Sequence, residues 1–370
     1  MEVISHKCPN CGGALTFNPD DQKFHCPFCL SVFTEKEVLE FEEKEKASHV
    51  DDPLGSTSSS EQEAATDVEN ADTETEAGQN LDLFLCPNCG AEIVTDSTTA
   101  ATFCYFCHNP VVLSGRLSGD FQPEKVLPFA ISKEKAVESF LAWTKKKWFI
   151  PSDFFDKKQI QLLTGVYFPY WNVEAKVKGQ FQGTGTTLRV WRVGEIEYTE
   201  TKQFAVSRAG KLSFSNLVKN ALSKNTQKKM VASVQPFPLE KAVDFHTQYL
   251  SGFQGEKRDI EYLDLKPEVE KELAGYTKTM LKQTAPGYTT LQETNLSSEV
   301  TEEKNHYVLL PVWLVTYQNK GDKTVYYYAM NGQTGKTAGI LPISFKKLAL
   351  FSGGIFLGLL ALLLLGGYLL

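Results

Sequence analysis

Two stretches of this sequence repeat one spacing of cysteines: CPNCGGALTFNPDDQKFHCPFC at residues 8–29 and CPNCGAEIVTDSTTAATFCYFC at residues 86–107. Both read C-x2-C-x14-C-x2-C, with a glycine after the second cysteine and a phenylalanine, Phe28 or Phe106, before the last. Agreement at every spacing indicates an internal duplication.

Each repeat has the layout of a zinc ribbon. Four thiolates must converge on the ion at about 2.3 Å, and a C-x2-C turn places two of them on one side. The glycine after each first pair, Gly12 or Gly90, permits positive φ. The 14 intervening residues suit a β-hairpin that returns the second pair opposite the first. The predicted ligands of two zinc ions are Cys8, Cys11, Cys26 and Cys29, and Cys86, Cys89, Cys104 and Cys107.

Four cysteines close each site, whereas a catalytic zinc ion keeps one position open for water. We therefore expect two structural Zn²⁺ ions that supply most of the folding free energy of these small modules. His25 and His108 adjoin ligand cysteines and are alternative ligands, which the complete cysteine sets make unnecessary. Disulfides are the competing interpretation of the eight cysteines, but C-x-x-C pairs favour metal in a reducing compartment.

The charge of the chain argues against general nucleic-acid binding. The 370 residues carry a formal net charge of −7, and the pI is near 5.6. Phosphate contacts need surplus positive charge, and both ribbon regions contain more acidic than basic residues. Contact with protein partners is therefore the expected use of both ribbons.

The order of segments predicts five units. Residues 1–40 form the first ribbon, 41–81 an acidic linker, 82–119 the second ribbon, 120–345 a mixed α+β body, and 348–370 a transmembrane helix. Residues 51–80 hold nine acidic side chains and no basic or aromatic one, which is typical of a disordered tether. This tether is either a spacer or a segment that docks on a basic patch elsewhere in the chain.

The last 23 residues, 348–370, contain no charge. At 1.5 Å per residue they span about 35 Å, enough for the hydrocarbon core of a bilayer. Lys346 and Lys347 precede them and no signal peptide is evident, so we expect a single-pass, tail-anchored protein of the cell membrane with a cytoplasmic amino-terminal part. Gly354 and Gly358 form a G-x-x-x-G motif that suits homo-oligomer formation through this helix.

The body shows both kinds of periodicity. Helices are predicted after Ser132, over 214–222 and over 267–283, where Pro267 would occupy the first turn. Strands are predicted over 165–183 and 307–318, and a hairpin over 323–342 with its turn near Asn331. These patterns predict an α+β class.

No catalytic constellation is recognisable in the body. Its histidines, His246 and His306, join no known motif, and a nucleophile elbow or dinucleotide fingerprint is missing from the sequence. We therefore expect no enzymatic activity. Residues 201–230 hold seven basic residues and no acidic one, which suits anionic lipid heads or the acidic linker. The same stretch supports the alternative function, a membrane-tethered nucleic-acid-binding protein of replication or transcription.

Together, CPNCG with its returning C-x-x-C, KVLPFAISKEKAVESFLAWTKKKWFIP, GVYFPYW and NGQTGK resemble bacterial TFIIB-type zinc-ribbon membrane proteins of the YdjG type. Proteins of this type are encoded beside PspA and SPFH-domain proteins in membrane-stress operons. The resemblance covers most of residues 82–370 and implies a membrane-bound assembly role with PspA-like or SPFH-domain partners. Our leading hypothesis is a membrane-anchored, non-enzymatic adaptor whose two ribbons hold protein partners at the cytoplasmic face.

Overall fold

The structure is a computed structural model. It describes residues 3–48, 81–104, 107–151, 163–223, 231–318 and 325–369. The predicted tether at 51–80 lies outside the described residues, as do Phe106 and residues 224–230 of the basic stretch. Disorder is wrong for residues 41–48 of the predicted linker, because they belong to a helix that ends at Ser48.

The predicted α+β class is confirmed. The helices are α1 (Glu35–Ser48), α2 (Lys133–Lys145), α5 (Tyr262–Gln283) and α6 (Phe345–Leu369), with the short 3-10 helices η1 (Ser114–Arg116), η2 (Gly119–Phe121), η4 (Leu239–Lys241) and η5 (Thr247–Leu250). The strands are β1 (Val3–Ile4), β2 (Thr16–Asn18), β3 (Lys23–His25), β4 (Val32–Phe33), β5 (Leu81–Leu85), β6 (Glu92–Asp96), β7 (Thr99–Phe103), β8 (Pro110–Leu113), β9 (Lys125–Val126), β10 (Thr164–Val193), β11 (Ile196–Asn220), β12 (Val243–Asp244), β13 (Gln254–Glu256), β14 (Thr290–Gln318), β15 (Val325–Asn331) and β16 (Thr337–Ile340).

One large sheet joins the body to the second ribbon. Within the described residues it has 11 strands, in the order β1-β8-β7-β13-β10-β14-β15-β16, with β11, β12 and β9 paired off this path. A three-stranded sheet, β2-β3-β4, belongs to the first ribbon, and the pair β5-β6 belongs to the second.

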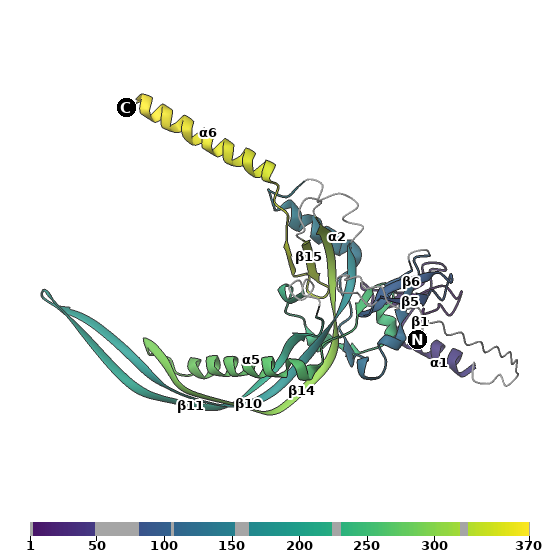
Figure 1. The fold of residues 1–370 in the computed structure, drawn as a ribbon, viewed down its shortest axis with the longest axis horizontal. Coiled ribbons are helices and arrows are strands. Elements are labelled where there is room, and N and C mark those ends of the chain that lie inside the picture. The colour runs from purple at the N-terminus through teal and green to yellow at the C-terminus, as the bar shows by residue number, and fades with distance from the viewer. Residues whose placement is uncertain are drawn as a thin grey trace, which may run out of the picture.

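Three strands continue out of the body as a long curved arm (Figure 1). β10 pairs with β11 on one side and with β14 on the other, and α5 packs against one face. At about 3.3 Å per residue, the 30 residues of β10 would extend about 100 Å if they were straight. Gly179 lets α5 approach closely, because a Cβ there would lie 2.4 Å from Thr277 Cγ2. β14 begins at Thr290, opposite Thr186, so the tip of the arm is a two-stranded ribbon.

The predicted helix over 214–222 is wrong, because residues up to Asn220 belong to β11. A β-bulge explains the error. Ala175 pairs with Phe214 and Val173 pairs with Leu217, so β11 holds one residue more than β10 between these pairs. The extra residue puts two apolar side chains three positions apart on one face, and this spacing imitates a helix.

The other predicted elements are largely confirmed. α2 follows Ser132 and buries Ala136 and Phe140. β15 and β16 form the predicted hairpin, whose turn begins directly after Asn331. α5 begins at Tyr262, earlier than predicted, so Pro267 lies inside the helix. Tyr262 packs against Trp171, with ring centroids 5.8 Å apart, and this burial accounts for the earlier start.

The core of the body is aromatic. Phe129 and Phe253 stack with ring centroids 4.3 Å apart, and Tyr167 and Trp313 close around them. Gly165 lies beneath this stack, where a Cβ would approach Phe253 Cδ1 to 2.6 Å.

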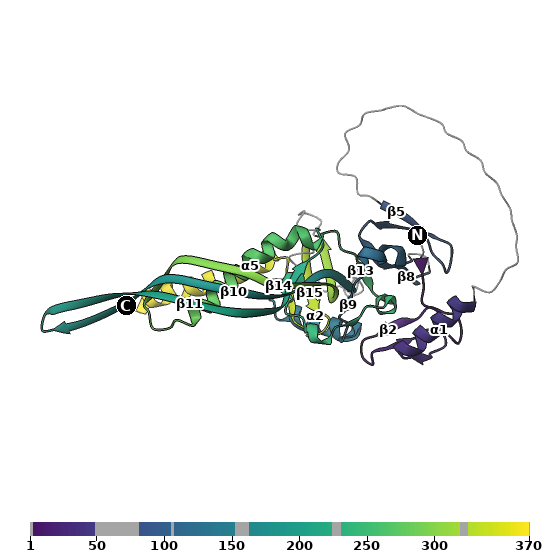
Figure 2. The same cartoon turned by 90° about the horizontal axis from the view of Figure 1, so that it is seen from below.

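α6 extends away from the body beyond its first turns. Residues 345–365 are long and apolar enough to cross a membrane, and their side chains are exposed. In both views α6 and the tip of the arm extend toward one side of the molecule, whereas the cysteine-bearing ribbons lie at the opposite end (Figures 1 and 2).

Candidate metal centres

The first ribbon is a short hairpin between two cysteine turns. β2 and β3 pair antiparallel, as expected from the 14-residue spacing, and β4 adds a third strand. α1 follows directly. Its first turn is closed by reciprocal hydrogen bonds, in which Thr34 N–H donates to Glu37 Oε2 (2.7 Å) and Glu37 N–H donates to Thr34 Oγ1 (3.4 Å).

The second ribbon repeats the turns with different surroundings. β5 and β6 pair on either side of the first cysteine turn, and β7 pairs with β8 and β13 in the large sheet. The hairpin predicted within the 14 residues between the cysteine pairs is therefore wrong for this ribbon, because β6 and β7 belong to different sheets. The Arg116 side chain bonds to residues of β5, β6 and β7. This side chain is 2% exposed, donates to the carbonyl oxygens of Asp96 and Thr99 at 2.5 Å, and pairs with Asp82. The one basic residue of the ribbon is therefore a structural group rather than a phosphate contact.

The structure brings each predicted ligand set together. Within each set the four sulfurs lie within 4.8 Å of one another. Cys8–Cys29 and Cys11–Cys26 are separated by 3.5 Å between Sγ atoms, and Cys86–Cys107 and Cys89–Cys104 by 3.7 Å.

These distances fit a metal ion and are too long for a disulfide bond. A tetrahedron with bonds of about 2.3 Å to zinc places its sulfurs about 3.8 Å apart, whereas a disulfide bond is about 2.05 Å long. All eight cysteines are free thiols. In each C-x2-C pair the first cysteine is buried and the second is more exposed, so each centre lies at the edge of its ribbon.

Local hydrogen bonds bias these thiols unequally. The Ser31 side chain lowers the pKa of Cys29 to about 6, and the Asn88 side chain lowers the pKa of Cys107 to about 6. The backbone N–H of Gly13 lowers the pKa of Cys11, but neighbouring cysteines outweigh it and raise that pKa to about 12. Four adjacent sulfurs repel one another when ionised, and a divalent cation would favour the thiolate form of all four.

All four cysteine turns share one backbone hydrogen bond and one positive φ. The N–H of the residue four positions after the first cysteine donates to that cysteine's carbonyl at 2.9 to 3.0 Å in every turn. Gly12 and Gly90 have φ of 71° and 73°, which confirms the reason for glycine there. Leu30 and His108 occupy the same position in the second turns with φ of 61° and 56°, and no feature of the sequence signals this strain.

Leu30→Gly is expected to stabilise the first ribbon by about 1 kcal/mol, because a left-handed conformation strains a residue that bears a Cβ. Leu30 is 81% exposed, so little packing is lost. Thermal unfolding of the full chain in mild detergent measures the change. Val32→Gly is the matched control, since Val32 lies in a strand, and that variant should be less stable than wild type. A Leu30→Gly chain less stable than wild type would contradict the strain.

Neither alternative histidine ligand, His25 or His108, belongs to the two cysteine clusters. His25 Nε2 lies 2.7 Å from Asp21 Oδ2. His108 lies in the turn that follows Cys104, and its backbone N–H donates to the Cys104 carbonyl at 2.9 Å. In the body, His306 Nδ1 lies 2.6 Å from Glu124 Oε2 and His246 Nε2 lies 3.7 Å from Glu35 Oε1.

Both ribbons are packed into the body. Phe17 of the first ribbon donates its N–H to the Ser251 carbonyl (3.0 Å), and its ring lies 5.2 Å from that of Tyr249 in η5. The Tyr249 hydroxyl donates to Glu35 Oε2 (2.9 Å) at the start of α1. In the second ribbon, β7 pairs with β13 of the body and β8 pairs with β1. The sequence contained no local sign of these contacts.

Each ribbon also exposes apolar side chains. On the second ribbon, Leu83 and Val94 lie directly opposite each other in the β5-β6 pair, and both are exposed. On the first, Phe28 and Leu30 of the second cysteine turn are exposed.

Carboxylates already engage part of the basic stretch. Lys219 pairs with Glu268 (3.0 Å) and Glu272, and Lys202 pairs with Glu200 (3.1 Å). Burial lowers the pKa of Lys219, but these two glutamates outweigh it and hold that pKa above its usual value. The described basic residues lie along β11, one side of the arm.

Comparison with curated proteins shows one family. The chain is 30% identical over 338 residues to the uncharacterized protein YdjG of Bacillus subtilis (strain 168), and the match covers 77% of this chain and 98% of that relative. No protein-family model and no solved structure matches the chain significantly.

Proposed function

The chain belongs to the family of the Bacillus subtilis protein YdjG, and we propose that it is a membrane-anchored adaptor without catalytic activity. It holds protein partners at the cytoplasmic face of the cell membrane, and each of its two contact modules is built around one structural zinc ion. The TFIIB-type character of the ribbons and partners of the PspA-like or SPFH-domain kind belong to the same proposal.

One observation carries it: the exposed apolar surfaces of both ribbons lie at the end of the molecule opposite the free end of α6 (Figures 1 and 2). With α6 in a bilayer, these surfaces would face away from the lipid. Since both ribbons are packed into the body, their position relative to the membrane would be fixed, which favours repeated encounter with one partner.

The anchoring half of the proposal rests on α6. Its 21-residue apolar segment has the length of a membrane span, and Lys346 and Lys347 mark the side at which it enters. Positive charge flanking a span favours the cytoplasmic side, so the ribbons and body would be cytoplasmic.

Nucleic-acid binding has less support. Both ribbons are poor in basic residues, Arg116 is buried, and Lys219 and Lys202 are paired with carboxylates. Phosphate contacts by β11 would have to displace those carboxylates.

Partner capture tests the proposal. The full chain carries an amino-terminal tag, membranes are solubilised gently, and co-purifying proteins are compared between wild type and Leu83→Ser/Val94→Ser. Removing two exposed apolar side chains should deplete a reproducible partner set at least about tenfold, because such side chains supply interface energy. The zinc content should remain at two ions per chain, as the substitutions spare every cysteine.

The matched control is Leu263→Ser, which removes an equally apolar and 77% exposed side chain from α5. It should retain the partners. Identical complexes in all three preparations, or salt-sensitive nucleic acid as the only captured species, would contradict the adaptor.

A further inference from the structure

The root of α6 is seated on the segment that follows α2. Ser344 N–H donates to the Phe149 carbonyl at 2.6 Å, and Lys347 Nζ donates to the Ile150 carbonyl at 2.7 Å. Phe351 of α6 packs edge-on against Phe149, with ring centroids 5.4 Å apart. α6 therefore meets the body at a defined place.

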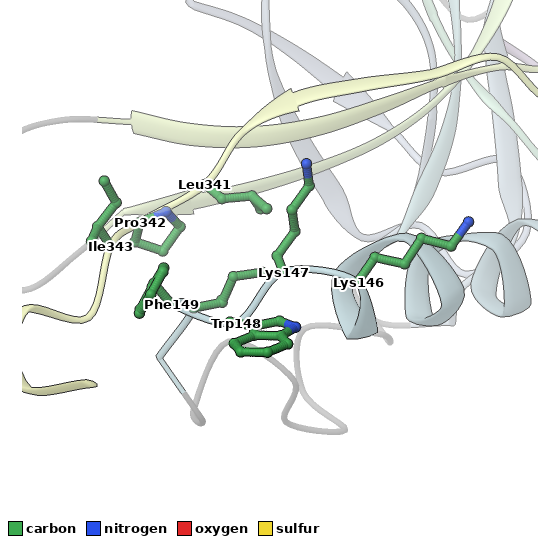
Figure 3. Close-up of a pocket in the computed structure, with 8 residues that line it drawn as sticks. Lys146, Lys147, Trp148, Phe149, Leu341, Pro342 and Ile343 are labelled. Carbon is green, nitrogen blue, oxygen red and sulfur yellow. The ribbon is translucent and has the colours of Figure 1, made fainter. Parts of the chain in front are cut away.

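A cavity of about 320 Å³ lies at this junction (Figure 3). Its lining comes from two segments, one after α2 and one joining β16 to α6: Lys146, Lys147, Trp148, Phe149, Ile150, Leu341, Pro342 and Ile343. Figure 3 shows Phe149 close to Pro342 and Ile343, with the two lysine side chains extending away from these apolar groups. Trp148 is 74% exposed, although it is a large apolar side chain.

Positive charge surrounds the cavity. Residues 145–151 and 341–348 hold five lysines and no carboxylate: Lys145, Lys146, Lys147, Lys346 and Lys347. Lys347 donates to a backbone carbonyl, and none of the five is paired with a carboxylate in the part of the chain that the structure describes.

We propose that this cavity binds one anionic glycerophospholipid of the membrane that α6 enters. The lysines at the rim of the cavity attract the phosphate of the headgroup, and an acyl chain covers Trp148 and Ile343. The inference rests on the proposed anchoring by α6, because a membrane at this level presents the lipid to the cavity.

Charge and polarity together select this ligand. A phosphate supplies the negative charge that these lysines lack, and basic pockets beside membrane helices suit acidic headgroups. Lysine stems cover apolar surface while their ammonium groups stay at the polar level, and tryptophan favours the same interface. A free phosphate would leave the apolar lining in water, and an apolar segment of a second copy would leave the lysines unpaired.

Lipid retention tests the site. The full chain is purified in nonionic detergent, mixed with phosphatidylglycerol or phosphatidylcholine, and examined by native mass spectrometry. Wild type should retain phosphatidylglycerol at about tenfold lower concentration than phosphatidylcholine, as expected for two lysines near one phosphate. Lys146→Gln/Lys147→Gln should lose this preference. Ile343→Asn, at an exposed position, should weaken retention of both lipids.

The matched control is Lys178→Gln/Lys211→Gln, which neutralises an exposed cross-strand lysine pair on the arm and should keep the preference. Equal retention of both lipids by wild type, or an unchanged preference in Lys146→Gln/Lys147→Gln, would overturn the proposal. So would displacement of the lipid by equimolar glycerol 3-phosphate, which lacks acyl chains.

Measuring lipid retention in detergent tests the lipid site independently of membrane insertion by α6. Lipid offered in detergent reaches the cavity whether or not α6 inserts into a bilayer. Flotation of the full chain with phosphatidylglycerol vesicles tests insertion independently. A chain that binds the lipid selectively in micelles but does not float would contradict the proposed anchoring and leave the lipid site supported.

Discussion

Replacing Cys8 and Cys26 by serine is expected to remove one of two zinc ions and to unfold more than the first ribbon. Both sulfurs are buried, and they share one core cluster with Phe17, Tyr249 and residues of the body. A structural zinc site contributes on the order of 10 kcal/mol of binding free energy to the fold around it. Loss of the metal should therefore weaken the contact between the ribbon and η5, and with it part of the body.

Two measurements check this expectation. Metal analysis should give one zinc ion per chain instead of two, and the thermal unfolding midpoint in mild detergent should fall steeply. Cys11→Ser/Cys29→Ser is the matched control, because it removes the exposed pair of sulfurs from the same centre. If the metal stabilises the fold, both variants behave alike. If only the buried variant is destabilised, thiol packing rather than metal holds the ribbon.

Phe253→Ala is expected to destabilise the chain by about 4 kcal/mol, within the range observed for large-to-small changes at buried aromatic positions. The Phe253 ring stacks on Phe129, and its centroid lies 6.5 Å from the ring centroid of Phe17 in the first ribbon. Removing this ring therefore opens a cavity where the ribbon meets the body. Chemical denaturation of the full chain in detergent measures the change. Phe204→Ala, at an exposed position on the arm, should change stability by less than about 1 kcal/mol.

If Phe253→Ala lowers the free energy of unfolding no more than Phe204→Ala does, the aromatic cluster is not the core of the body. A loss confined to the first ribbon, seen as early zinc release with an intact second transition, would mean that the two parts unfold separately. The contacts of Phe17 predict instead that they unfold together.

Much of the candidate site could be predicted because its information is local. The C-x2-C spacing places the sulfurs, and Gly12 and Gly90 mark the turns that hold them. The periodicity around Ala136 and Phe140 likewise locates α2, because adjacent turns of one helix share the same buried face. In these cases a few neighbouring residues determine the geometry.

The features that could not be predicted depend on distant partners. Phe17 meets Tyr249 across more than 200 residues of sequence, so nothing near Phe17 reveals that the ribbon is packed into the body. The bulge between Phe214 and Leu217 exists only in register with β10, and the sequence of β11 alone resembles a helix there. Leu30 adopts positive φ because the metal-binding turn imposes it, against its own preference.

The arm gives the molecule a mechanical property. β10 runs without a break from Val193 at the tip to Thr164 in the aromatic core, and β11 is bonded beside it for nearly all of that length. This strand pair is held at one end only, like a beam fixed in a wall, and its cross-strand hydrogen bonds share any force applied at the free end. A force applied at the tip of the arm is therefore transmitted along β10 to the aromatic core, which lies between the zinc ribbons and α6.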